Sequence, residues 1–350
     1  MKKIIIIIIV LIILILLIGG IIIFTDQNKS FKDKLKDIGY SNNEASQISK
    51  LVSKENEDVI LNNKYNNNLT SILTNKNYKE DNLGLYLKYA DNNKKAKTND
   101  IINIVNLGLA NYHYSNLLGK LVSQKYFIKN NLDRYLAYGN SNAKETVTEV
   151  NCNLDYNYYE NTKEVNINDN NLMLVNKYYY LPLNYEPNDL VTLDGTYNIG
   201  TNNKMRKEAA DAFMKMADAA KLDNITIKNA SGYRSYNYQV TLYNNYIKRD
   251  GKEAADTYSA RAGYSEHQTG LVSDVNQIDS TFENTDAFKW LNENAYKYGF
   301  ILRFPKGKEK LTGYKYEPWH YRYVGKKAAK IIRDEDLTLE EYYAYYIQNS

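Results

Sequence analysis

The chain has few of the residues that cross-link a protein or interrupt its regular structure. Its 350 residues include one cysteine, Cys152, and four prolines, all of them at position 182 or later. A single cysteine excludes an intrachain disulfide and a zinc site built from thiolates. The first half also lacks the proline that would break a helix, so it can form helices without interruption.

Histidine is scarce as well, and neither sign of charge dominates. There are three histidines, His113, His267 and His320, and 45 Lys and Arg against 41 Asp and Glu give a formal net charge of +4. The charges form no basic block, so the sequence gives no indication of a nucleic acid partner. Without thiolates, a metal would need imidazole and carboxylate ligands. His113 has no carboxylate pattern beside it and is expected to be an ordinary, partly buried histidine.

An uninterrupted apolar run stands at the amino terminus. Ile4–Phe24 is 21 residues long, carries no charge and follows Lys2 and Lys3. A bilayer-spanning helix needs about 20 apolar residues, whereas the apolar part of a signal peptide has about 7–15 and ends at small residues. We therefore expect residues 1–25 to form an uncleaved transmembrane anchor, with a cleaved signal peptide as the alternative. The two lysines favour a cytoplasmic amino terminus, which predicts a single-pass protein of the cell membrane with the residues after the span on the outside.

Residues 26–142 are polar and predict a helical region. Ser41 and Glu44 have the spacing of a capping box, which begins a helix. The segment 82–89 recurs as 131–138, with five of eight positions identical. An internal repeat of this length predicts two stacked copies of a small helical unit. We expect such a region to serve as a spacer or to bind a partner rather than to perform chemistry.

A change in pattern predicts a boundary or linker over residues 143–171, followed by a domain over 172–335 and a helical tail over 336–350. Within the linker, Thr146–Thr148 and Val165–Ile167 alternate like short strands. The following domain has strand patterns near 225–227 and 271–276 and helical patterns near 203–222, 236–249 and 285–298. Few strands interleaved with helices of uneven length predict an α+β fold rather than a regular parallel α/β fold.

Two short segments of this domain contain the residues for a catalytic metal site. His267 precedes Asp274 by seven residues with Gly270 between them, and Glu317 precedes His320 by three. Three protein ligands and one open position are usual for catalytic zinc, and His267, Asp274 and His320 meet that count. Glu317 is then free to act as general base and acid. Taken singly, each could be an ordinary loop, turn or surface residue, but two of only three histidines fall in the pattern.

The motifs Ser265-x-His267-x-x-Gly270-x-x-x-Asp274 and Glu317-x-Trp319-His320 resemble those of the VanY-type D-alanyl-D-alanine carboxypeptidases. Their superfamily includes lysostaphin-type peptidases and the hedgehog signalling domain. Two upstream segments are also similar to the family, Leu174 to Val191 and Ser231-Gly232-Tyr233-Arg234-Ser235 with Gln239. The resemblance covers about residues 172–333.

The resemblance implies a fold with a small antiparallel sheet flanked by helices and a zinc site, and a zinc carboxypeptidase activity. The expected substrates are peptidoglycan stem peptides ending in D-alanine, in a bacterium of the Gram-positive type. Glu317 would take a proton from zinc-bound water, and Arg234 would contact the substrate carboxylate or the oxyanion. Gln239, Ser265 and Trp319 would shape the substrate pocket.

Several alternatives stay open at this point. The cleavage is either D,D or L,D in type, and the enzyme could instead be an endopeptidase acting inside the stem peptide or its cross-bridge. A non-catalytic, zinc-bearing wall-binding module is a further alternative, and so is a protein whose helical half docks a partner in wall synthesis.

Overall fold

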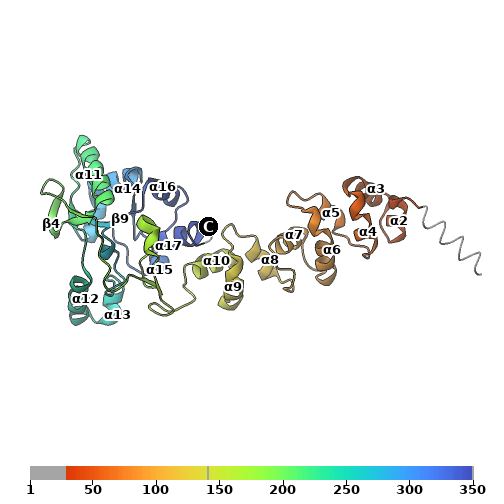
Figure 1. Ribbon diagram of the computed structural model, residues 1–350, viewed down its shortest axis with the longest axis horizontal. Coiled ribbons are helices and arrows are strands. Elements are labelled where there is room, and N and C mark those ends of the chain that lie inside the picture. The colour runs from red at the N-terminus through yellow and green to blue at the C-terminus, as the bar shows by residue number, and fades with distance from the viewer. Residues whose placement is uncertain (1–28, 140–141, 349–350) are drawn as a thin grey trace, which may run out of the picture. The chain divides into compact units, whose positions relative to one another are not determined.

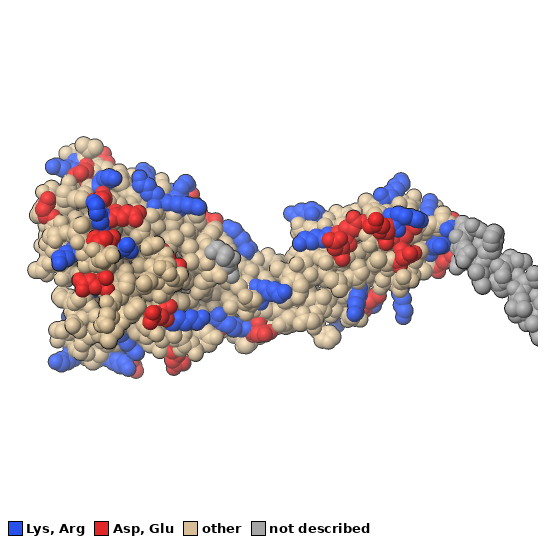
Figure 2. Space-filling model, in the orientation of Figure 1, with Lys and Arg blue, Asp and Glu red and all other residues tan. Residues whose placement is uncertain are grey.

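The computed structural model describes residues 29–139 and 142–348, and its contacts divide the chain into two compact units. Unit 1 is residues 1–129 and unit 2 is residues 130–350. Figure 1 labels their elements. On the face seen in Figure 2, basic and acidic side chains lie near one another in both units.

Within residues 29–129, every regular element is a helix. The α-helices are α2 (Phe31–Asp37), α3 (Asn42–Leu51), α4 (Glu57–Leu61), α5 (Leu69–Leu73), α6 (Leu83–Asn92), α7 (Thr98–Asn106) and α8 (Asn116–Val122). Short 3₁₀ helices are η1 (Lys54–Asn56) and η2 (Glu80–Asn82), and η3 (Lys129–Asn131) spans the division. The predicted capping box is present at α3, where Ser41 Oγ accepts from Glu44 N at 3.2 Å and Glu44 Oε2 accepts from Ser41 N at 2.8 Å. The prediction of a helical region is thus confirmed for the described part of unit 1.

The repeated segment has the same hydrogen bonds in both copies. In each copy an asparagine and a tyrosine donate to the side-chain oxygen of a later asparagine: Asn82 and Tyr86 to Asn106 at 3.0 and 2.5 Å, and Asn131 and Tyr135 to Asn151 at 2.9 and 2.5 Å. The second copy belongs to unit 2, where it comprises α9 (Leu132–Tyr138) and α10 (Ala143–Asn151). The contact division at residues 129 and 130 therefore falls between the copies, ahead of the boundary expected at 143–171.

Unit 2 combines helices with one five-stranded sheet and two short pairs of strands. Its further α-helices are α11 (Lys207–Leu222), α12 (Tyr236–Asp250), α13 (Lys252–Asp256), α14 (Asp286–Asn294), α15 (Glu309–Thr312), α16 (Lys326–Asp334) and α17 (Leu339–Tyr346). Its 3₁₀ helices are η4 (Ile167–Leu172), η5 (Glu266–Thr269), η6 (Ser280–Asn284) and η7 (Ala295–Tyr298). The paired strands are β1 (Lys163–Glu164) with β2 (Tyr179–Tyr180) and β3 (Leu190–Thr192) with β5 (Lys204–Arg206).

The five-stranded sheet has the order β4-β6-β7-β9-β8. Its strands are β4 (Asn198–Asn202), β6 (Asn229–Ser231), β7 (Val272–Val275), β8 (Phe300–Leu302) and β9 (His320–Tyr323). Every neighbouring pair is antiparallel except β4 with β6. The α+β prediction is confirmed, and the sheet is antiparallel apart from this one edge.

Helix α11 forms because its apolar residues recur every three or four positions. Ala209, Phe213, Met216 and Ala220 are fully buried along one face. The helix begins at Lys207 rather than near residue 203, because residues 204–206 pair with β3 instead. Phe213 packs edge-on against Phe300 of β8, with ring centroids 6.0 Å apart. This contact joins the helix to β8, an edge strand of the sheet.

Three of the predicted strands are wrong. Of these, residues 165–167 lie beyond β1, which ends at Glu164, and Ile167 begins the 3₁₀ helix η4. Residues 146–148 lie in α10, where Thr146, Val147 and Val150 share a buried face and Asn142 caps the first turn. The alternation of Thr and Val in that segment therefore reflects one side of a helix. Residues 225–227 form no strand, and the strand of that region is β6, two residues later. Ile227 is buried in the core all the same.

The predicted anchor over residues 1–25 lies outside the described residues. Among the described residues, no helix is long and apolar enough to cross a membrane.

Candidate active site

The register of the sheet brings two of the predicted metal ligands together. Asp274 on β7 is the direct partner of His320 on β9. His320 Nδ1 lies 3.3 Å from Asp274 Oδ1, and both side chains are buried. Strand pairing thus joins residues that are 46 positions apart in the sequence.

His267 reaches the same place from the short helix η5. Gly270 ends this helix in the left-handed conformation, with φ of +69°, which glycine adopts without strain. The chain then turns directly into β7, as the sequence predicted. His267 Nδ1 lies 2.7 Å from the carbonyl oxygen of Gly232. Because a carbonyl only accepts, Nδ1 carries the proton, and Nε2 is left facing Asp274 Oδ2 at 3.4 Å.

These three side chains fit a metal ion. One donor atom from each of His267, Asp274 and His320 lies within 4.8 Å of the others, and all three residues are buried. The separation of 3.3 Å between His320 Nδ1 and Asp274 Oδ1 matches the distance of about 3.3 Å between two ligands of a tetrahedral zinc ion with bonds of about 2.0–2.1 Å. Asp274 Oδ1 is buried without a hydrogen-bond partner among the described residues. A buried, unpaired carboxylate oxygen is costly unless it binds a cation.

Glu317 lies beside this cluster. Its Oε2 is 3.3 Å from His320 Nδ1, and the residue is 8% exposed. Burial raises the pKa of Glu317 above its ordinary value, against the opposing effect of His320. A raised pKa suits a carboxylate that first takes and then returns a proton near neutral pH.

The two histidines differ in their electrostatic surroundings. Burial, with a contribution from the charge of Arg234, lowers the pKa of His267 to about 4. Burial also opposes a charge on His320, but the facing carboxylates of Asp274, Glu266 and Glu317 outweigh it and raise the pKa of His320 well above its ordinary value. His267 is therefore in the neutral form that metal binding requires.

Arg234 is part of the site, with contacts that the sequence did not predict. Its Nε donates to Ser231 Oγ at 3.0 Å, and its Nη2 lies 2.6 Å from Asp274 Oδ2. Ser231 on β6 is paired with Asp274 on β7, so the sheet register also positions the arginine. The expected contact of Arg234 with the substrate stays a prediction.

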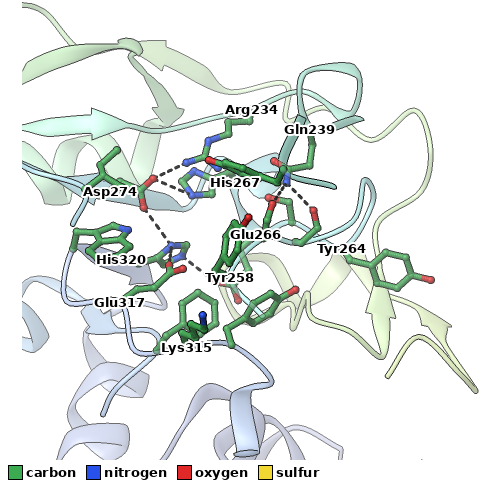
Figure 3. A pocket seen from close by; sticks show the side chains of 18 of the residues that line it. Arg234, Gln239, Tyr258, Tyr264, Glu266, His267, Asp274, Lys315, Glu317 and His320 are labelled. Carbon is green, nitrogen blue, oxygen red and sulfur yellow. Dashed lines mark hydrogen bonds and ion pairs between the residues drawn. The ribbon is translucent and has the colours of Figure 1, made fainter. Parts of the chain in front are cut away.

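All of the predicted site residues line one cavity of about 470 Å³ (Figure 3). They are Arg234, Gln239, Ser265, His267, Asp274, Glu317, Trp319 and His320. Gln239 on α12 is 1% exposed and donates to the carbonyl of Ala260 at 2.8 Å, while its side-chain oxygen has no partner among the described residues. Trp319 packs against the core as well as lining the cavity, as expected. The roles of Gln239, Ser265 and Trp319 in binding stay predictions.

His113 lies in unit 1 and does not belong to this cluster. It is exposed, so the prediction of partial burial is wrong. The segment around it places Tyr112 and Tyr114, rather than the imidazole, in partly buried positions.

Sequence reasoning missed Glu266 and several aromatic residues of the cavity wall. Glu266 stands between Ser265 and His267, is 5% exposed and lies within 3.8 Å of His320 Nε2. Tyr258, Tyr264 and Tyr314 also line the cavity. Among 35 tyrosines and 41 acidic residues, nothing in the composition distinguishes these. The available signal for Glu266 was its place inside the metal motif.

Comparison with known proteins gives the same assignment. The model of the VanY family, D-alanyl-D-alanine carboxypeptidase, matches residues 202–326. The putative carboxypeptidase YodJ of Bacillus subtilis is 50% identical over 184 residues, which are 50% of this chain and 67% of that protein. A D-alanyl-D-alanine carboxypeptidase of Enterococcus faecium is 38% identical over 200 residues, or 53% of this chain and 63% of the relative. The match thus spans about two thirds of these relatives.

The chain is also similar to proteins of solved structure. The structure of the LdcB LD-carboxypeptidase is 47% identical, covers 53% of this chain and 91% of that chain, and has a TM-score of 0.50. A VanY D,D-pentapeptidase solved in complex with Zn(II) is 34% identical, covers 49% of this chain and 98% of that chain, and has a TM-score of 0.43.

Fold, site and relatives together define a metallopeptidase of the carboxypeptidase type. The chain belongs to the VanY family of D-alanyl-D-alanine carboxypeptidases. The predicted family and enzyme class are thereby confirmed.

Proposed function

We propose that this chain is a zinc-dependent carboxypeptidase that removes C-terminal D-alanine from peptidoglycan stem peptides. The observation that carries the proposal is the convergence of His267, Asp274 and His320, with Glu317 beside them, in one cavity. The family of the chain supports the substrate class.

Each residue has a distinct part in this reaction. His267, Asp274 and His320 would hold the ion, and zinc there supplies Lewis acidity that makes water nucleophilic at neutral pH. Glu317 accepts a proton from the attacking water and returns it to the leaving amine of D-alanine. Such proton transfer contributes about 10²–10⁴-fold to a rate.

Arg234 is a positive group of the cavity wall, in contact with the proposed metal ligand Asp274. Its paired contact with Asp274 keeps the guanidinium at the cavity wall, where 16% of the side chain is exposed. From there it is available to the terminal carboxylate of a substrate or to the oxyanion. The first of these roles would favour a carboxypeptidase over an endopeptidase. Gln239 lines the same cavity, and its side-chain oxygen has no hydrogen-bond partner among the described residues.

The type of cleavage depends on the length of the stem peptide: a tetrapeptide stem is the substrate for L,D cleavage and a pentapeptide stem for D,D cleavage. The 47% identity to the LdcB LD-carboxypeptidase supports a tetrapeptide stem as the preferred substrate. The D-alanyl-D-alanine carboxypeptidase of Enterococcus faecium, at 38% identity, keeps the pentapeptide as the second candidate.

The same proposal includes a location. The apolar run Ile4–Phe24 and the lysines before it support a single-pass anchor, with the catalytic unit outside the cell membrane. The helical region that precedes residue 130 then acts as a spacer between the membrane and the catalytic unit.

The test is to determine which bond the full chain cuts. We would incubate it with a tetrapeptide stem, a pentapeptide stem and a cross-linked stem dimer, and identify the products by mass spectrometry. Release of free D-alanine by the wild type and by His113→Ala, but not by His267→Ala, is the expected result. Cleavage of the dimer alone would identify an endopeptidase, and binding without cleavage would identify a wall-binding module.

A further inference from the structure

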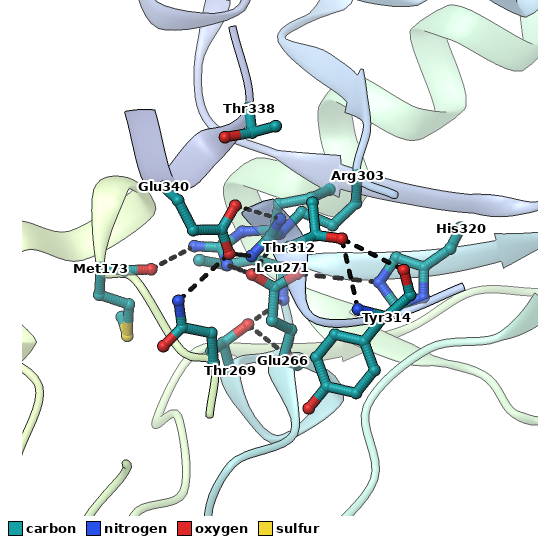
Figure 4. A network of polar contacts seen from close by, with 12 residues as sticks. Met173, Glu266, Thr269, Leu271, Arg303, Thr312, Tyr314, His320, Thr338 and Glu340 are labelled. Carbon is teal, nitrogen blue, oxygen red and sulfur yellow. Dashed lines mark hydrogen bonds and ion pairs between the residues drawn. The ribbon is translucent and has the colours of Figure 1, made fainter. Parts of the chain in front are cut away.

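Behind His320 lies a buried network of two acidic and two basic side chains (Figure 4). Its members, whose side chains are each at most 3% exposed, are Glu266, Arg303, Arg322 and Glu340. Arg303 donates to Glu266 Oε1 at 2.8 Å and makes two bonds to Glu340, at 2.9 and 2.6 Å. Arg322 donates to the same Oε1 of Glu266 at 3.0 Å. The network is electrically balanced, as buried charges require.

One carboxylate oxygen of this network points at a metal ligand. Glu266 Oε2 lies 3.8 Å from His320 Nε2, and both atoms are buried without a hydrogen-bond partner among the described residues. The other nitrogen of His320, Nδ1, faces Asp274 and Glu317 at 3.3 Å. When Nδ1 is a metal ligand, Nε2 must carry the proton, and Glu266 is the acceptor that it faces. Carboxylates in this position fix the ring and raise the basicity of a ligating histidine.

The network extends beyond the part of the chain that defines the family. Glu340 lies on α17, past residue 326 where the family match ends. It also accepts from Asn176 Nδ2 at 3.2 Å. The two hydrogen bonds between Glu340 and Arg303 fix the orientation of the guanidinium group. Arg303 in turn donates a hydrogen bond to Glu266. The C-terminal helix is thus joined to the metal site by a continuous series of charged contacts.

We propose that Glu266 is the positioning residue for His320, and that Glu340 on α17 fixes Glu266 through Arg303. The C-terminal helix therefore contributes to the affinity and geometry of the metal site. This inference rests on the proposed function, because it assumes that His320 binds zinc.

The test measures the metal site rather than the reaction. Zinc dissociation constants of the full chain would be determined by competition with a chromophoric chelator, and the visible spectrum would be recorded after replacing zinc with Co²⁺. Glu266→Gln keeps the shape of the side chain and removes its charge, and we expect it to weaken zinc binding roughly 10- to 100-fold. Glu340→Gln is also expected to weaken zinc binding, but by a smaller factor than Glu266→Gln. Both variants should change the cobalt spectrum, which reports the ligand geometry.

The neighbouring residue provides a matched control. Glu341 caps α17 by accepting from Thr338 N at 2.8 Å, and the contacts of Glu340 with Arg303 do not involve it. Glu341→Ala should lower the unfolding temperature and leave the zinc dissociation constant and the cobalt spectrum unchanged. Circular dichroism would show whether Glu266→Gln folds. If it does not, the comparison of zinc binding in Glu340→Gln and Glu341→Ala tests whether α17 fixes Glu266.

The two possible failures can be told apart. A wild-type chain that binds zinc, with both glutamate-to-glutamine variants binding it equally well, would overturn the positioning role and leave the proposed function intact. Equal losses in Glu340→Gln and Glu341→Ala would also overturn it, because the effect would then be general loosening of the helix. A wild-type chain that binds no zinc would overturn the proposed function and this inference together.

Discussion

Among single residues, Asp274 contributed most to predicting the candidate metal site from the sequence. All four positions of β7 are buried, and a carboxylate occupies the third. Because a buried carboxylate needs a compensating partner, its place in an apolar pattern predicts cations or a metal nearby. The scarcity of histidine then pointed to His267 and His320. Arg234, which lies 2.6 Å away, was predicted for the site but not as the partner of Asp274, because that contact depends on the pairing of β6 with β7.

Glu266 shows why some residues cannot be predicted from sequence. A glutamate is usually a solvated surface charge, and the partners that bury it, Arg303 and Arg322, follow 37 and 56 positions later. Only the folded sheet brings these side chains together.

Glu317 gives a prediction at this scale. Glu317→Gln should bind zinc as tightly as the wild type, because Glu317 is not one of the three clustered ligands. Its rate of D-alanine release should fall by about 10²–10⁴-fold, because the proton acceptor is lost. Metal content by atomic absorption and steady-state kinetics check the two parts. An active Glu317→Gln protein would remove Glu317 from the mechanism.

Lys177 gives a prediction for the pH dependence of stability. Its Nζ lies over the rings of Tyr158 and Tyr314, at 4.3 and 4.7 Å, and donates to the carbonyl of Asp256 at 2.7 Å. Burial lowers the pKa of Lys177 from 10.5 to about 8. Between these two values the unfolded chain binds more protons than the folded one, so the free energy of unfolding rises with pH in that window.

Unfolding midpoints at pH 8 and pH 10 would be compared in the wild type and in Lys177→Met. The wild type should gain stability relative to the variant as the pH rises. Parallel pH profiles in the two proteins would show that Lys177 is charged in the folded state across this range.

At the scale of elements, periodicity predicted the helices better than the strands. Helix α12 and strand β7 lie where the sequence predicted them, because their patterns extend over the whole element. Strand β9 was not predicted, since all four of its residues, including His320 and Arg322, are buried and show no alternation. A strand whose polar side chains are buried in a site has no period-two pattern to detect.

Gly232 follows the end of β6 and contacts His267, a proposed metal ligand, and this contact gives a prediction about stability and zinc binding. A Cβ atom on Gly232 would lie 2.4 Å from the carbonyl oxygen of Lys204, and the Gly232 carbonyl accepts the bond from His267. Gly232→Ala must therefore shift this segment. We expect a loss of about 1–3 kcal/mol of stability from overpacking, together with weaker zinc binding. Denaturant unfolding and zinc titration measure the two effects.

Gly195→Ala is the matched control, because a Cβ atom there would meet nothing within 4 Å. It should leave both stability and zinc affinity near those of the wild type. Unchanged zinc binding in Gly232→Ala would show that the Gly232 carbonyl does not orient His267.

For the whole molecule, the catalytic unit begins earlier than the sequence suggested. The linker expected at 143–171 includes α10, which packs against α17. Glu149 of α10 accepts from Tyr138 Oη at 2.6 Å and pairs with Lys310, and Thr148 contacts Tyr345 at 3.3 Å. Composition indicated a change of pattern near residue 143. It could not show whether the residues before or after that position pack with the catalytic unit.

Two truncated chains test this division. A fragment of residues 130–350 should keep the carboxypeptidase activity of the full chain, because it contains the whole of unit 2. A fragment of residues 150–350 should unfold at a lower temperature, since it lacks the α10 contacts with α17. Equal thermal stability of the two fragments, measured by circular dichroism, would contradict a structural role for α10.

The most direct test of the central claim is the release of D-alanine by the purified full chain, with and without a chelator. We would incubate it with a tetrapeptide and a pentapeptide stem and quantify free D-alanine. The account predicts release that stops when the chelator is added and returns when zinc is restored, with the preferred stem distinguishing L,D from D,D cleavage. No release from either stem by zinc-loaded protein, or release that continues in the chelator, would contradict it.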